Sequence, residues 1–480
     1  MTQHRVHQDQ PPAALFLVYK FPDLDHLVPV VTRLATEGRS VQVVSLNPLL
    51  DPIDAGSLES ADWRIRHLHQ LEGVAYDSVY RLGPQTKLEA FTGWLLTRPL
   101  FRISFRRSAP VRGLETQLVQ RLVKLLIIRV RGAVGSLGRR LIYLPLMNRV
   151  APRIFDDIWA RRLLDFVSSP ALIVDHSVRY NLLVFGPLMR VARSRGMPII
   201  ALPHGLPLFS GRMEVFALAY KNLKEANFDS VVVAHDMLKD DLIAHGVDPS
   251  IIQVLGSARY CREWCESLYE IIPYVPPFPE DHKKLRVVYM DRGRAWINKD
   301  LIREVLLAAA DLDFIDLVYK PHPRSNNIHQ SELPGRVTIA TEADSINLVR
   351  WADVVIGSVS SVLIDVLLAD KTLIYPTFFD DEKMLLDEFG VCWRVDDVDE
   401  LLFALRTLHG GRTERPYGRE ALKHFEEVVI LGGQADRDVL GGYVDLILGL
   451  GGQQESSVRE KAVSDTSSSS PGPGLANSIT

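Results

Sequence analysis

Cysteine is scarce in this sequence: its 480 residues include only Cys261, Cys265 and Cys392. Three cysteines are too few for the disulfide framework of a secreted domain. Cys261 and Cys265 are four residues apart, a helical spacing, and no second pair lies nearby to complete a zinc site. We therefore expect reduced thiols, a cytoplasmic protein, and no bound metal or cofactor.

Long apolar runs are missing as well. No stretch of 18 apolar residues occurs, which argues against an ordinary membrane span. The opening residues MTQHRVHQDQPP hold no apolar core of the kind that a secretory signal requires. The composition is otherwise that of a globular protein, with 47% hydrophobic and 24% charged residues. The length exceeds the roughly 250 to 300 residues at which one core stops growing, so we expect two domains.

Acidic residues are nearly absent from one segment. Residues 98–153 hold 13 Lys or Arg and a single acid, Glu115, although the whole chain has a net charge of −4. Between Gln117 and Arg131, five polar side chains share one face of a helical wheel: Gln117, Gln120, Arg121, Lys124 and Arg131. Such a helix could lie on the anionic inner face of the cytoplasmic membrane, or pack on its own domain with a solvated basic face. Nucleic acid is not an expected partner, because few aromatic residues are available for stacking.

Strand-like and helix-like segments alternate along the chain. One series of apolar strands runs from Ala14–Tyr19 to Ile252–Leu255, and a second runs from Arg286–Met290 to Val391–Arg394. This alternation predicts an α/β fold with parallel sheets, arranged as two Rossmann-like domains facing across a cleft. We expect an acceptor domain at 1–270, a proline-rich linker at 271–284, a donor-binding domain at 285–450 and a disordered tail at 451–480.

Two polar motifs follow strands of the second series. Lys320-Pro321-His322-Pro323-Arg324 ends one strand, and Gly357-Ser358-Val359-Ser360-Ser361 ends another. Polar loops at the carboxyl ends of buried strands are where α/β proteins hold ligands. Serines that open a helix offer hydroxyl and backbone donors that suit a phosphate. Each motif also has a purely structural interpretation, as a rigid turn or as an ordinary helix cap.

Four motifs together resemble a known family. They are, in order, Pro203–Leu208, Leu255–Tyr260, Lys320–Pro323 and Ala352–Asp365. This order resembles the CDP-glycerol glycerophosphotransferases of teichoic-acid synthesis, and it covers roughly residues 200 to 390. The histidine-proline motif with a serine-rich helix start is also similar to capsule Kdo transferases and polysialyltransferases, which use CMP-sugars. The chain departs from the first family by having Gly-Ser-Val-Ser-Ser where that family usually has Thr-Asp-Tyr-Ser-Ser.

The resemblance implies a metal-independent GT-B transferase of cell-envelope glycan synthesis. Such an enzyme would move a glycerophosphate or sugar group from a cytidine-nucleotide donor to a surface-polysaccharide or lipid-linked acceptor. By this resemblance His322 would hydrogen-bond the departing phosphate, and Ser360 and Ser361 would cradle it. The further residues expected to bind the donor are Lys320, Arg324, Asp365, Arg292 and Arg259, although Asp365 could instead only orient the serines.

His204 is the candidate general base. It follows the apolar run Ile199–Leu202 in a turn with Gly205, and a neutral imidazole can accept a hydroxyl proton near neutral pH. Asp175, which ends another apolar run together with His176, is an alternative acid/base group. The pairs Asp23/Asp25 and Asp311/Asp313 invite a metal-binding interpretation, but short acidic pairs are mostly surface features, so no metal is expected.

Two other functions stay open at this stage. One is a UDP-sugar 2-epimerase or a UDP-sugar glycosyltransferase, although the Gly-Gly-x-x-Glu-Glu type of helix start found in the epimerases is missing. The other is a non-catalytic scaffold that binds glycan or membrane. Substitution of His204 and His322 separates an enzyme from a scaffold, because only an enzyme loses product formation.

Overall fold

The computed structural model describes most of the chain apart from several gaps. The described residues are 12–46, 62–79, 155–176, 185–208, 223–224, 226–279, 283–292, 299–322, 328, 330–358, 360–379, 383–410 and 415–451. The basic segment 98–153, Arg324 and the tail from 452 lie outside these ranges, so the predictions made for them stay predictions. Within the described part, no helix has the length and apolar character needed to cross a membrane.

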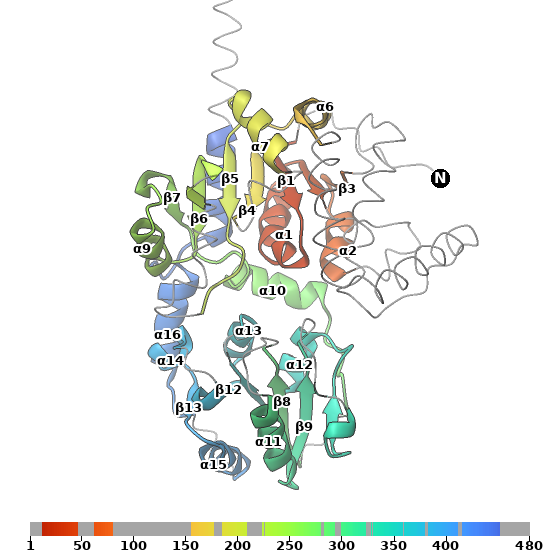
Figure 1. Ribbon diagram of the computed structural model, residues 1–480, viewed down its shortest axis with the longest axis vertical. Coiled ribbons are helices and arrows are strands. Elements are labelled where there is room, and N and C mark those ends of the chain that lie inside the picture. The colour runs from red at the N-terminus through yellow and green to blue at the C-terminus, as the bar shows by residue number, and fades with distance from the viewer. Residues whose placement is uncertain are drawn as a thin grey trace, which may run out of the picture. The chain divides into compact units, whose positions relative to one another are not determined.

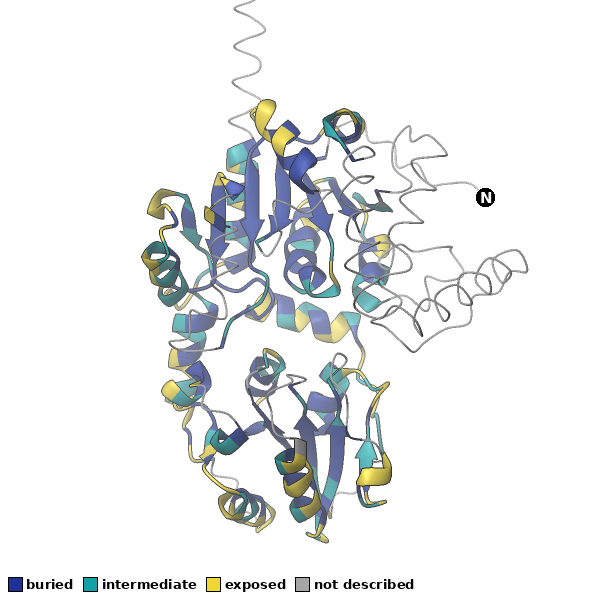
Figure 2. Ribbon diagram, viewed as in Figure 1, coloured by how far each residue is buried: buried dark blue, intermediate teal, exposed yellow. Residues whose placement is uncertain are grey.

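The first sheet has the strand order β3-β2-β1-β4-β5-β6-β7, and its neighbouring strands run parallel where their register is known. Every residue of β1, β2, β4, β5 and β6 is buried (Figure 2), as expected of a parallel sheet covered on both faces. The strands are β1 (Ala14–Val18), β2 (Val41–Ser45), β3 (Val74–Ser78), β4 (Leu172–Asp175), β5 (Ile199–Leu202), β6 (Ser230–Val233) and β7 (Ile252–Val254).

Helices connect these strands (Figure 1). They are α1 (Phe21–Thr36), α2 (Trp63–Gln70), α6 (Asp157–Val167), α7 (Phe185–Ser194) and α9 (Asp236–Ala244), with α10 (Arg262–Ile271) following β7. Side-chain caps begin several of them: Asp62 accepts the amide of Arg64, and Asp156 accepts that of Trp159. After α10, residues 273–279 of the proline-rich stretch form neither helix nor strand.

The second sheet has the order β10-β9-β8-β11-β12-β13 and is also parallel. Its strands are β8 (Leu285–Met290), β9 (Ile315–Lys320), β10 (Val337–Ile339), β11 (Val354–Gly357), β12 (Thr372–Pro376) and β13 (Trp393–Val395). Its helices include α11 (Lys299–Ala310), α12 (Ser345–Trp351), α13 (Val362–Leu368), α14 (Leu385–Glu388), α15 (Val398–His409) and α16 (Arg419–Phe425), with a π-helix at Glu426–Ile430.

Alternate residues of the second sheet pack into two different cores. Val287 and Tyr289 of β8 lie in the cluster that contains residues of α11 and α15. Val288 and Met290 lie in the cluster that contains residues of α12 and α13. This period of two places helices on both faces and leaves the strand ends as the part of the sheet that is open to a ligand.

The chain therefore contains two parallel α/β sheets, and the predicted fold class of two Rossmann-like domains is confirmed. The described residues pack into two compact units, one within 1–202, 225–231 and 441–480 and the other within 203–224 and 232–440. The predicted residue bounds of the domains and the cleft between them stay predictions.

Each sheet has one point at which the order of its strands reverses. In the first sheet this switch point lies between β1 and β4, and in the second it lies between β8 and β11. The loops after two such strands lead away in opposite directions, which leaves a crevice at the carboxyl edge. The residues that follow β1, β4, β8 and β11 are therefore the first places to look for a site.

Candidate functional site

Asp23 lies at the switch point of the first sheet. Its chain leaves β1 at Val18 and enters α1 through Lys20. One carboxylate oxygen of Asp23 accepts the amide hydrogens of Tyr19 and Lys20, at 2.9 and 2.8 Å. The residue is only 2% exposed. The turn that begins α1 thus fixes the orientation of the Asp23 carboxylate.

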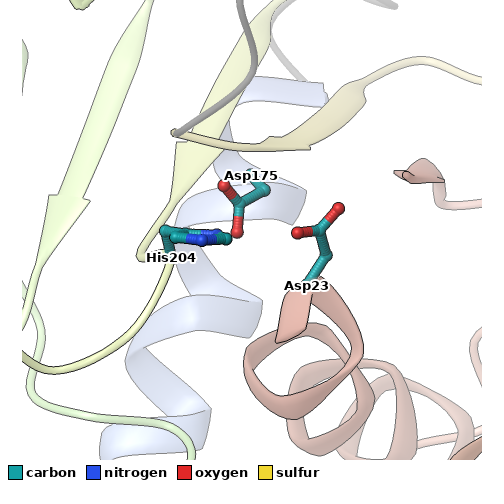
Figure 3. A group of neighbouring side chains, drawn as sticks. All are labelled: Asp23, Asp175 and His204. Atoms are coloured by element: carbon teal, nitrogen blue, oxygen red, sulfur yellow. The ribbon is translucent and has the colours of Figure 1, made fainter. Parts of the chain in front are cut away.

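Asp175 and His204 come from the two neighbouring strands. Asp175 is the last residue of β4, is 1% exposed, and pairs in register with Leu202 at the end of β5. His204 follows β5 by two residues and is half-buried. One carboxylate oxygen from each aspartate and one ring nitrogen of His204 all lie within 4.8 Å of one another. Figure 3 shows Asp175 and His204 side by side, with Asp23 at the start of α1 turned toward them.

The charges in this cluster constrain its chemistry. Two carboxylates that are almost completely buried need a positive partner, because an uncompensated charge is costly away from water. A neutral His204 that takes up a proton supplies that charge with residues already in the chain. A divalent cation would also supply it, since each of the three side chains offers one ligand atom. In the first case the cluster can take up a proton from a hydroxyl group and hold it.

The sequence prediction singled out Asp175 and His204 and missed Asp23. The pair Asp23/Asp25 was interpreted as a surface feature, which is wrong for Asp23; Asp25 is half-buried, and its carboxylate forms an ion pair with Arg64 at 2.6 Å. The available signal was the position of Asp23 just after an apolar strand. The interpretation of Asp311 and Asp313 as surface residues is confirmed, because both are exposed and both form ion pairs with Arg336.

Serines follow β11 at the switch point of the second sheet. Ser358 is buried, Ser360 is half-buried and Ser361 is exposed. Ser361 is the N-cap of α13 but makes no capping bond through its side chain, so a purely capping role for this hydroxyl is wrong. The adjoining Gly357 is tightly packed, since a Cβ there would come within 2.9 Å of Leu363 Cδ2.

Lys320 is engaged at the end of β9. Its ammonium group donates to the carbonyl oxygens of Thr341 and Ala343, at 3.1 and 2.7 Å. Burial lowers the pKa of Lys320. Two of its three donors therefore hold the loop after β10 in place, and one is left for a ligand. His322 lies two residues further on and is half-buried.

Arg292 follows β8, on the other side of the same switch point, and is 5% exposed. The preceding Asp291 accepts a hydrogen bond from the Tyr319 hydroxyl at 2.9 Å. Burial and the nearby Asp291 raise the pKa of Tyr319, which therefore stays a neutral donor. A buried guanidinium across the switch point from three serines is a suitable environment for an anionic group.

Arg259 and Asp365, both predicted to bind the donor, contact each other. Their side chains form an ion pair at 3.3 Å and are 9% and 13% exposed. The neighbouring Tyr260 donates its hydroxyl to the carbonyl oxygen of Ser361 at 2.8 Å. The structure thus ties the loop after β7 to the start of α13.

Sequence comparisons place the chain in no family. No protein-family model matches it, and no curated protein matches its sequence. The resemblance to CDP-glycerol glycerophosphotransferases therefore stays a prediction.

Solved structures of similar fold do exist. One is the glycotransferase of kitacinnamycin, with 14% identity over 91% of this chain and 99% of that chain, at a TM-score of 0.48. Another is the calicheamicin glycosyltransferase CalG4, with 11% identity over 92% and 99%, at a TM-score of 0.44. A third is a UDP-N-acetylglucosamine 2-epimerase of Listeria monocytogenes, with 10% identity over 91% and 95%, at a TM-score of 0.49. At these scores the likeness carries no argument about activity.

Proposed function

We propose that the chain is a transferase that moves a glycosyl or glycerophosphate group from a nucleotide-activated donor to a hydroxyl acceptor. The observation that carries this proposal is the placement of chemically complementary groups at both switch points. The first sheet has two buried carboxylates beside an imidazole, which suits proton transfer. The second has a buried arginine opposite serines, which suits an anion.

The donor is assigned to the edge of the second sheet. The hydroxyl groups of Ser360 and Ser361 and the imidazole of His322 would hydrogen-bond its phosphate, and Arg292 would balance its charge. Donors held in place before the reaction stabilise the negative charge that develops on a leaving nucleotide. Lys320 and Arg324 would add to the positive field. Because α13 has only seven residues, we assign this role to side chains rather than to a helix dipole.

The acceptor is assigned to the edge of the first sheet. His204 would take the proton of the acceptor hydroxyl while the hydroxyl oxygen forms a bond to the transferred carbon or phosphorus atom. The bond from that atom to the donor's phosphate oxygen would break, and its electron pair would leave with the nucleotide. Asp175 would orient His204 and stabilise the imidazolium that forms.

We propose a cytidine nucleotide as the activating group and a surface-glycan or lipid-linked molecule as the acceptor. Both come from the motifs that resemble CDP-glycerol and CMP-sugar transferases. An acceptor of this kind agrees with peripheral attachment through the basic segment 98–153. A scheme in which a neutral imidazole accepts the proton requires no metal.

Nucleotide release tests the proposal. The full chain is incubated with CDP-glycerol, a CMP-sugar and UDP-N-acetylglucosamine, with and without a mixture of lipid-linked glycans, and free nucleotide and sugar products are separated. Acceptor-dependent release of CMP supports the proposal. Acceptor-dependent release of UDP would show that the activating nucleotide contains uridine rather than cytidine. Conversion of UDP-N-acetylglucosamine to its 2-epimer without acceptor, or no reaction with any donor, would reject a transferase.

A further inference from the structure

The loop between β7 and α10 is held in a fixed position from both sides. Gly256 has a φ of +87°, and the following Ser257 donates its amide to the carbonyl oxygen of Ile430 at 2.7 Å. At Gly256, a Cβ would come within 2.7 Å of that same carbonyl oxygen. The end of the π-helix therefore fixes where this loop begins.

From this anchored loop two side chains reach α13. The Tyr260 hydroxyl bonds to the carbonyl oxygen of Ser361, and the Arg259 guanidinium pairs with Asp365, one turn further along α13. The guanidinium carbon of Arg259 also lies 5.1 Å from the centre of the Tyr260 ring. Tyr260 is 4% exposed and Arg259 is 7% exposed. The two buried residues lie against each other, and both bond to the first turn of α13.

A pocket lies along one side of α13. This pocket has a volume of about 330 Å³ and is lined by residues of α10, α13 and α16. Its lining includes Ile364, Leu367 and Leu368 of α13, and Cys265 and Tyr269 of α10. The contacts of Arg259 and Tyr260 are polar and directional, so they add to the apolar packing by fixing the orientation of the start of α13.

We infer that Arg259 and Tyr260 are positioning residues for the phosphate-binding serines, rather than donor ligands. They fix the carbonyl of Ser361 and the first turn of α13, and so set the direction of the Ser360 and Ser361 hydroxyls. This inference rests on the proposed function, because it requires a nucleotide phosphate at those serines. Asp365 belongs to the same group of contacts and makes its contribution through Arg259.

Tyr260→Phe is the direct test, because it keeps the ring and removes only the hydroxyl that bonds to Ser361. The matched control is Tyr417→Phe, since the Tyr417 hydroxyl also bonds to the backbone: it accepts the amide hydrogen of Leu373 at 2.9 Å and donates to the carbonyl oxygen of Lys371 at 3.4 Å. Binding of CDP and of UDP is measured by calorimetry at a temperature where all variants are folded. Amide hydrogen exchange is followed in the peptide that covers residues 358–368.

The inference predicts that Tyr260→Phe weakens nucleotide binding about 5- to 10-fold and speeds exchange in that peptide. Tyr417→Phe should lower the melting temperature and leave binding unchanged. Arg259→Lys keeps a positive charge beside Asp365, so this variant should bind nucleotide more tightly than Arg259→Gln. Equal binding by wild type and Tyr260→Phe would overturn the inference while leaving the proposed function in place. No binding of either nucleotide by the wild type would overturn both.

Discussion

The Asp175 carboxylate and the His204 imidazole approach within 4.8 Å at the carboxyl edge of the first sheet, although 29 positions separate them in the sequence. The parallel pairing of β4 with β5 produces this proximity, because it brings the two strand ends to the same place. Asp23 reaches the same point from β1. The three side chains together define the part of the molecule that the proposed proton transfer requires.

Loss of the imidazole should abolish most activity without affecting the donor. His204→Gln keeps a hydrogen-bonding side chain but cannot accept a proton near neutral pH. We expect kcat to fall about 10²- to 10⁴-fold, the usual contribution of a general base, with nucleotide affinity unchanged. Steady-state kinetics and calorimetry with the same nucleotide measure the two quantities. A variant that retains full activity would exclude His204 as the base.

Asp175→Asn should reduce activity in the same direction, because an amide leaves the imidazolium less stabilised. Asp23→Asn tests the residue that the sequence analysis missed. Since each buried carboxylate opposes the other, removing one negative charge at Asp23 should change the pH dependence of activity as well as its maximum. A pH–rate profile identical to that of the wild type would show that Asp23 serves only to begin α1.

Much of the fold could be predicted from the sequence, because buried parallel strands are recognisable as short apolar runs. The positions of His204 and Asp175 at strand ends followed from the same pattern. The role of Asp23 could not be predicted, since its burial depends on how the turn after β1 folds back and bonds to its carboxylate. The pairing of Arg259 with Asp365 was also missed, because 106 positions separate them and neither lies in a strand.

A chelator separates the two ways of balancing the Asp23–Asp175–His204 cluster. If the proton that His204 takes up supplies the positive charge, excess EDTA should leave activity and melting temperature unchanged. Mn²⁺ and Zn²⁺ should then raise the melting temperature of the wild type no more than they raise that of Asp23→Asn, in which an amide replaces one of the carboxylates. Inactivation by EDTA that Mn²⁺ or Zn²⁺ reverses in the wild type alone would instead show that these residues hold a metal.

Stability should fall below neutral pH because of His235. This residue is 1% exposed, its Nδ1 accepts the Leu238 amide at the start of α9, and burial lowers its pKa to about 4. In the unfolded chain His235 takes up a proton near pH 6.5, whereas in the folded chain it stays neutral until about pH 4. The stabilisation is therefore complete above pH 6.5 and is lost as the pH falls toward 4. The full loss is on the order of 3 kcal/mol.

The variant His235→Asn checks this assignment, since asparagine is a good helix N-cap and does not titrate. Melting temperatures between pH 7.5 and 4.5 should decline less steeply for the variant than for the wild type. His67, whose pKa is also lowered by burial, contributes an effect of the same sign in both proteins. Parallel curves for the two proteins would show that His235 does not cause the acid sensitivity.

Gly256 should tolerate alanine much less well than Gly38. Both have a positive φ, +87° and +73°, but a Cβ at Gly38 meets nothing within 4 Å, whereas at Gly256 it meets a backbone oxygen at 2.7 Å and Val439 at 2.8 Å. Gly38→Ala should therefore cost only the left-handed backbone strain, about 1 kcal/mol. Gly256→Ala should cost at least about 1 to 3 kcal/mol more because of overpacking. Denaturant unfolding compares them, and equal costs would contradict the tight packing of the loop after β7.

The most direct test of the central claim is a thermal-shift series on the full chain with CMP, CDP, UDP, GDP and no ligand, repeated with Ser360→Ala/Ser361→Ala. A nucleotide at about 100 times its dissociation constant stabilises a folded protein by roughly 2.7 kcal/mol. The account predicts that CMP or CDP raises the melting temperature of the wild type by several degrees and raises that of the serine variant much less. Absence of a shift with every nucleotide, or equal shifts in both proteins, would contradict a nucleotide-activated donor at the edge of the second sheet.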